Sequence, residues 1–149
     1  MHEQPKQYHA YHNPVLAALV QVSRAAEFVN QQMDIALADL QITNVQYNIL
    51  RILKRSPENG ISRTDIKRQL IAQSIDLTRS INGLVNSGYV VRITTEQDRR
   101  IVLHQITEKG VEAITKIDPL LNEMLQQIGA KMTPEEWLQL NGLCLKMLD

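Results

Sequence analysis

The sequence predicts a mostly α fold with a small β component, in which a helix-turn-helix is followed by a two-stranded hairpin and flanked by helices at both ends. Through most of the chain, apolar residues recur at three- and four-residue steps, which is typical of amphipathic helices. Two short segments, 89–93 and 101–106, are instead rich in β-branched residues, and a polar stretch joins them. This order of elements indicates an α+β winged helix with helical extensions.

The first half of the chain carries clear helix starts. Asn13 and Pro14 predict a helix that runs to about residue 38, because asparagine caps helices and proline is favoured at the first helical position. Thr43 and Gln46 have the spacing of a capping box and open a second helix. A turn at residues 56–60, which contains proline and glycine, ends that helix, and a short third helix follows.

The fourth helix is predicted from near Ser74 to Ser87, with Leu77, Ile81 and Leu84 on its buried side. Gly88 stands where helices commonly end in glycine, just before the hairpin.

Two further helices follow the hairpin. Thr107 can cap the first of them, in which Pro119 predicts a kink or a break. Thr133 and Pro134 combine a capping box with a proline at the first helical position and open the last helix.

The length of 149 residues predicts one domain, or one domain with helical extensions, that can bury a core without disulfides or a metal. Cys144 is the single cysteine, so no disulfide can form within the chain, and the cytoplasm is the expected compartment. The first residues lack the apolar segment of a secretion signal, and no apolar run has the ~18–20 residues that cross a membrane. We expect a cytoplasmic protein with no membrane partner.

The net charge of zero conceals an uneven distribution. Residues 43–110 hold eleven Lys and Arg against six Asp and Glu, whereas the rest of the chain holds five against ten. A basic central module is typical of phosphate binding, although a surplus this modest can also arise by chance.

The outward face of the fourth helix is polar, as the DNA-reading helix of a helix-turn-helix must be. Arginine and asparagine on such a face can read base edges in the major groove. A solvated surface helix would show the same pattern. The candidate residues on this face are Ser74, Asp76, Thr78, Arg79, Asn82 and Asn86.

The tip of the hairpin adds a second candidate contact. Asp98, Arg99 and Arg100 place two arginines beside a carboxylate, and arginine is attracted to the negative potential of a narrow minor groove. An ordinary charged turn is the alternative interpretation.

Residues 43–110 as an ordered set resemble the MarR family of bacterial regulators. The resemblance rests on Gln46, Asp65-Ile66, Thr78-Arg79, Gly88-Tyr89-Val90, Asp98-Arg99-Arg100 and Thr107-Glu108-Lys109-Gly110. It implies that Arg79, Arg99 and Arg100 contact DNA, and that the chain is a homodimer held by its terminal helices, at 13–40 and 111–149. It also implies a sequence-specific transcriptional regulator, in many members one that releases DNA on binding a small phenolic or other hydrophobic effector.

The chain departs from this family pattern early in the fourth helix. Ile75 and Asp76 stand where family members often have small hydroxyl residues. The Asp76 carboxylate would repel phosphate, so it must face a base, pair with a nearby arginine, or weaken binding.

Other candidate sites lie outside the module. Arg24, Phe28, Tyr47 and Trp137 could line an effector pocket, although core packing explains them equally well. Two alternatives keep the fold: a dimer that binds a protein instead of DNA, and a redox switch at Cys144. His2, His9 and His12 are interpreted as part of a tail rather than as a metal site, and we expect no cofactor and no enzyme activity.

Overall fold

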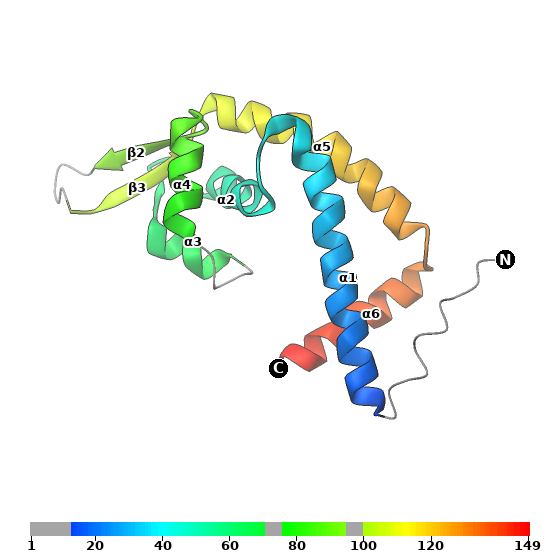
Figure 1. The fold of residues 1–149 in the computed structure, drawn as a ribbon. Coiled ribbons are helices and arrows are strands. Elements are labelled where there is room, and N and C mark those ends of the chain that lie inside the picture. Colours follow the sequence, from blue (N-terminus) through cyan, green and yellow to red (C-terminus); the bar gives the residue numbers. More distant parts are fainter. Residues whose placement is uncertain (1–12, 71–75, 95–99) are drawn as a thin grey trace.

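The computed structural model describes residues 13–70, 76–94 and 100–149. The α2–α4 helices and the strands lie at one end, α1 and α6 lie at the other, and α5 runs between them (Figure 1). No helix within the described ranges is long and apolar enough to cross a membrane. The elements are α1 (Pro14–Leu37), the 3-10 turn η2 (Ala38–Leu40), α2 (Asn44–Arg55), β1 (Ile61–Ser62), α3 (Arg63–Gln69), α4 (Leu77–Asn86), β2 (Val90–Thr94), β3 (Val102–Ile106), α5 (Glu108–Gly129) and α6 (Pro134–Leu148).

The expected hairpin is β2 and β3, which pair antiparallel with Val90 opposite Ile106. A third strand, β1, joins the outer edge of β3 with Ile61 opposite His104, so the strand order is β1-β3-β2. The sequence did not predict β1, because two residues are too few to show an alternating pattern.

The core lies among α2, α3, α4, the sheet and the first half of α5. Leu77, Ile81 and Leu84 of α4 are buried, as predicted. Their partners in this core include Leu50 of α2 and Ile114 of α5. The inward face of α4 is thereby fixed, and its polar face points outward.

Local capping forms as the sequence predicts. The Asn13 Oδ1 atom accepts a hydrogen bond from the Val15 N–H over 2.9 Å. Capping boxes are present at Thr43, with Gln46, and at Thr133, with Glu136.

Helix α4 begins later than predicted, at Leu77 instead of near Ser74. Asp76 is its N-cap, and the Asp76 Oδ1 atom accepts a hydrogen bond from the Arg79 N–H over 3.0 Å. Ser74 lies outside the described residues. The other end agrees with the prediction: Gly88 has a φ of +78°, which glycine adopts without steric cost.

Of the two outcomes predicted at Pro119, a kink or a break, the break does not occur. The helix is continuous from Glu108 to Gly129 and only changes direction along its length (Figure 1). Proline removes one N–H donor, and the packing of the flanking turns, with Ile117 and Leu121 buried, keeps the helix intact.

The start of α5 is attached to the end of α4. The Thr107 hydroxyl donates to the Gly88 carbonyl over 2.7 Å, and Lys109 Nζ donates to the Ser87 carbonyl over 2.7 Å. A Cβ atom on Gly110 would collide with the Tyr89 carbonyl oxygen, so only glycine allows this close approach. Helix α4 is therefore joined directly to the helix that leads into the C-terminal flank.

Candidate nucleic-acid interface

The outward face of α4 presents Thr78, Arg79, Asn82 and Asn86, all of them exposed. Together with Thr43 and Gln46 at the start of α2, this face lines a hollow of about 760 Å³. An exposed polar face along a helix is what a major-groove contact requires.

Gln46 connects the start of α2 to α4. Its Oε1 atom accepts from the Thr43 N–H over 3.0 Å, and its Nε2 atom donates to the Ser80 carbonyl over 3.4 Å. A Cβ atom on Gly83 would come within 2.6 Å of Gln46 Nε2, so glycine makes room for this bridge. The sequence predicted the capping role of Gln46 but not its contact with α4.

Two arginines, one on α3 and one on β2, donate hydrogen bonds to side chains on the exposed face of α4. Arg63, the first residue of α3, donates from Nη1 to the Thr78 hydroxyl over 2.8 Å. Arg92, on β2, donates from Nη2 to Asn82 Oδ1. Both acceptors are neutral, so the guanidinium charges remain available to attract phosphate.

A cavity of about 420 Å³ separates α4 from the start of α3 and the sheet. Its polar lining is dominated by cationic and hydroxyl side chains, which favours anionic groups at this place. The lining residues are Ser62, Arg63, Thr64, Thr78, Ile81, Asn82, Arg92, Arg100, Ile101, Val102 and His104.

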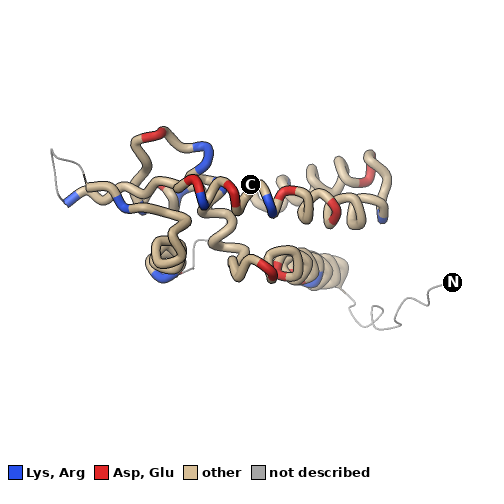
Figure 2. The backbone as a smooth tube through the Cα atoms, turned by 90° about the horizontal axis from the view of Figure 1, so that it is seen from above, with Lys and Arg blue, Asp and Glu red and all other residues tan. Residues whose placement is uncertain are grey.

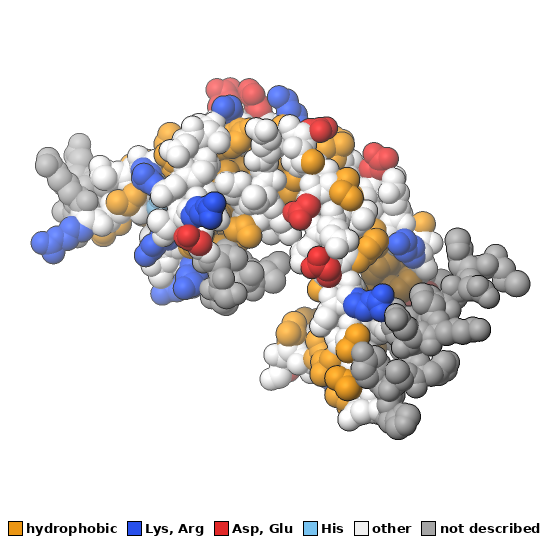
Figure 3. Space-filling view, in the orientation of Figure 1, with side chains coloured by type: hydrophobic (Ala, Val, Ile, Leu, Met, Phe, Trp, Pro, Cys, Tyr) orange, Lys and Arg blue, Asp and Glu red, His pale blue; other side chains and the backbone are white. Residues whose placement is uncertain are grey.

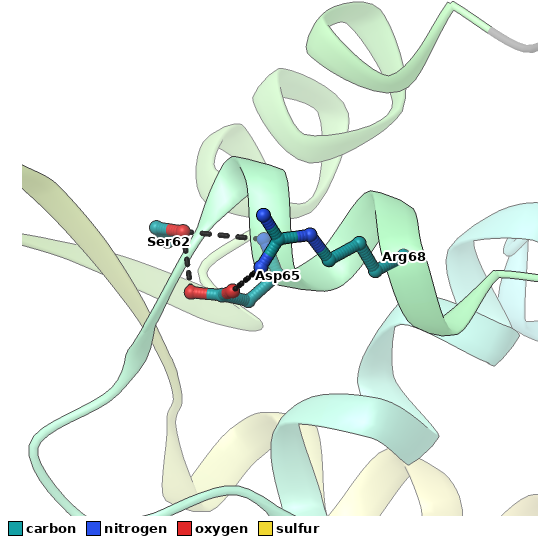
Figure 4. A network of polar contacts seen from close by, with 3 residues as sticks. All are labelled: Ser62, Asp65 and Arg68. Carbon is teal, nitrogen blue, oxygen red and sulfur yellow. Dashed lines mark hydrogen bonds and ion pairs between the residues drawn. The ribbon is translucent and has the colours of Figure 1, made fainter.

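The start of α3 is fixed by a small polar network (Figure 4). The Ser62 hydroxyl donates to Asp65 Oδ2 over 2.6 Å and accepts from the Asp65 N–H over 3.2 Å. Arg68 Nη1 lies 3.2 Å from Asp65 Oδ1, a surface ion pair that contributes little to stability. The network caps a helix of seven residues and so positions Arg63 beside α4.

Charge is distributed along the molecule as the sequence predicts. Lys and Arg gather around α4 and the strands (Figure 3), and the tube view shows several carboxylates on α5 and around α1 (Figure 2). In the same space-filling view, hydrophobic side chains are exposed over α1 and α6, at the end away from the strands.

The predicted wing residues fall only partly within the structure. Arg100 is exposed at the start of the chain segment that leads into β3 and lines the cavity behind α4. Asp98 and Arg99 lie outside the described residues, as do His2, His9 and His12.

The four predicted effector residues lie in two different surroundings. The Phe28 ring lies under Lys131 Nζ at 4.5 Å, and Trp137 Nε1 donates to the Gly129 carbonyl over 3.0 Å, so both pack near the α5–α6 turn. Tyr47 is instead a core residue of α2, with 3% of its surface exposed. Its hydroxyl accepts from Arg51 Nη1 over 2.8 Å. Arg24 lies in the middle of α1, and the shared pocket stays a prediction.

Cys144 is partly buried in α6. Within the described ranges, no group of three or more His, Cys, Asp or Glu residues is arranged to hold a metal ion.

Comparisons with known proteins agree with this geometry. Residues 42–110 match the family model described as a winged helix DNA-binding domain. The multiple antibiotic resistance protein MarR of Escherichia coli K12 is 27% identical over 135 residues, which cover 87% of this chain and 92% of MarR. The regulator PapX of Escherichia coli is 24% identical over 72% of this chain, and the match spans only 65% of PapX.

Solved structures show the same fold. A MarR-like transcription regulator from Bacillus cereus superposes with a TM-score of 0.79 at 22% identity, covering 87% of this chain and 92% of that one. The MepR–DNA complex from S. aureus gives a TM-score of 0.77 at 22% identity, over 87% and 94% of the two chains.

His104 makes the stability of the sheet depend on pH. Its side chain is buried, and within the described chain its Nδ1 atom has no hydrogen-bond partner. Burial lowers the pKa of His104 below 6.5, and the cations Arg92 and Arg63 lower it further, against a backbone hydrogen bond at Ile61 that raises it. Between the folded and the unfolded pKa, the unfolded chain binds more protons.

We therefore expect the contribution of this group to the free energy of unfolding to be constant well above pH 6.5, to fall as the pH drops from about 6.5 toward the lower folded pKa of His104, and to level off below it. Urea unfolding of the wild type and of His104→Leu, from pH 8 to pH 5 at one protein concentration, measures the effect. The wild type should lose stability relative to the variant as the pH falls. Parallel curves would show that His104 does not titrate differently in the two states.

Proposed function

We propose that the chain is a regulator of the MarR type, which it resembles in sequence and fold, and that it binds double-stranded DNA as a homodimer and regulates transcription in the cytoplasm, without catalysing a reaction. The observation that carries the proposal is the polar face of α4. Side chains from α2, α3 and β2 donate hydrogen bonds to residues of this helix, and two of them are the cations Arg63 and Arg92. Arg79 is the candidate for reading base edges, and Arg100, with Arg99, for contacting the backbone or the minor groove.

The homodimer is supported by apolar surface that one chain leaves exposed. In α1 only Leu37 is buried, and α6 has no buried residue. Leu140, Leu143 and Met147 of α6 are 41%, 59% and 50% exposed. A helix that is apolar over most of its circumference needs to be buried, and a second copy of the same helices supplies the matching surface.

A two-fold dimer would place two copies of α4 about 34 Å apart, one turn of DNA, and would therefore read a pseudo-palindromic site. Occupying such a site in a promoter blocks access to it, so repression is the simplest outcome. A small hydrophobic or phenolic effector would act by favouring a dimer with a different spacing of the two α4 helices. It can do so only if its affinity for the two forms differs.

The proposal is tested by fluorescence anisotropy with the DNA upstream of the protein's own gene and with random duplex, each at two salt concentrations. We expect tight and selective binding with a steep salt dependence, because phosphate contacts release counterions. Arg79→Ala should relax discrimination between sequences. Arg100→Ala should weaken binding to all sequences and reduce the salt slope by about 1.

Lys116→Ala is the matched control, because Lys116 is an exposed cation on α5, outside the winged module. It should leave affinity, selectivity and salt slope unchanged. Weak binding of the wild type to both duplexes with no salt dependence would rule out the DNA-binding proposal and favour a protein partner.

The dimer is tested by a pair of double variants on neighbouring stripes of α6. Leu140→Glu with Met147→Glu places two charges on the apolar stripe, since a seven-residue step returns to the same face of a helix. Gln139→Glu with Lys146→Gln lowers the net charge equally but on the polar stripe. Sedimentation at one concentration should find a monomer for the first variant and a dimer for the second. A dimer in both cases would place the interface elsewhere.

A further inference from the structure

We propose that Arg92 sets the base preference of Asn82 by fixing the orientation of its side-chain amide. The inference rests on the proposed function, in which the outward face of α4 reads the major groove. It makes Arg92 a positioning residue for recognition, in addition to any contact that its charge makes with phosphate.

The hydrogen bond between these residues allows one orientation only. Arg92 Nη2 donates to Asn82 Oδ1, from β2 to the middle of α4. A guanidinium has five N–H donors and no acceptor, so the Asn82 amide must turn its oxygen toward Arg92 and its NH₂ group away. A flipped amide would set two donors against each other.

The position of Arg92 in this contact is set by its place in the sheet and not by a bond to another side chain. Arg92 lies in the middle of β2, where it is opposite His104 of β3. Within the described parts of the chain, no carboxylate forms an ion pair with Arg92, and no second residue bonds the Asn82 amide. The orientation of the Asn82 amide therefore depends on the Arg92 guanidinium.

An asparagine amide with a fixed orientation binds bases differently from one that can flip. Asparagine reads adenine through two bonds, in which Oδ1 accepts from N6–H and Nδ2 donates to N7. The Asn82 oxygen has a second lone pair, but because it is turned toward Arg92, the NH₂ group is the part of the amide that is left to face a base. Guanine offers two acceptors, N7 and O6, to such a donor. The pair thus favours guanine over adenine at the base pair below Asn82.

Two variants of Arg92 separate orientation from charge. Methionine fills a similar volume and cannot donate, so Arg92→Met frees the amide to bind adenine. Lysine is a donor without an acceptor, so Arg92→Lys keeps the amide oxygen turned inward. Each variant and the wild type are used to select sequences from a pool of randomised duplex DNA, and the retained sequences are counted. Thermal unfolding confirms that each variant is folded.

We expect the wild type and Arg92→Lys to enrich guanine at one position in each half-site. Arg92→Met should shift that position toward adenine by about tenfold, the size of a lost or gained two-bond contact. The shift must disappear when Asn82→Ala is added, because it acts through that amide.

Equal loss of affinity for all sequences in Arg92→Met, with the base preference unchanged, would overturn the inference and leave the proposed function standing. If the wild type enriches no sequence at all, the proposed function itself fails, and the inference fails with it.

Discussion

The placement of α4 depends on side chains that reach it from three other elements. Gln46 bonds the Ser80 carbonyl, while Arg63 and Arg92 bond the side chains of Thr78 and Asn82. Buried leucine and isoleucine fix the inner face of the helix, and polar contacts add directional bonds to this packing. These contacts also set the orientation of side chains on the exposed face. Because both arginines bond neutral partners, they orient the helix and still give its surroundings a positive field.

The same helix is also bonded to the part of the chain that is proposed to pair with a second copy. Thr107 and Lys109 bond the carbonyls of Gly88 and Ser87, so the end of α4 and the start of α5 move together. Since α5 continues without a break into the α6 region, a change in how two chains pack would alter the distance between two copies of α4. The fold thereby offers a direct path from the proposed dimer interface to the proposed DNA-reading face.

The sequence predicted what depends on near neighbours and missed what depends on distant ones. Caps at Asn13, Thr43 and Thr133 were predictable because donor and acceptor lie two or three residues apart. The bonds of Gln46 to Ser80 and of Arg63 to Thr78 join residues far apart in the chain, which no local pattern reveals. At Asp76 the residue type is that of a helix cap, but the polar face was extended past it to Ser74, so the cap was missed. The family resemblance supplied the role of α4, and its contacts came only from the fold.

Hydrogen exchange of the backbone amides, with and without duplex DNA, tests the central claim most directly, because it reports which elements DNA covers. The account predicts slower exchange in α4 (Leu77–Asn86) and in the paired strands β2 and β3, with α6 (Pro134–Leu148) unchanged. Slower exchange confined to α1 and α6, or equal in every element, would contradict the assignment of α4 as the DNA-reading helix.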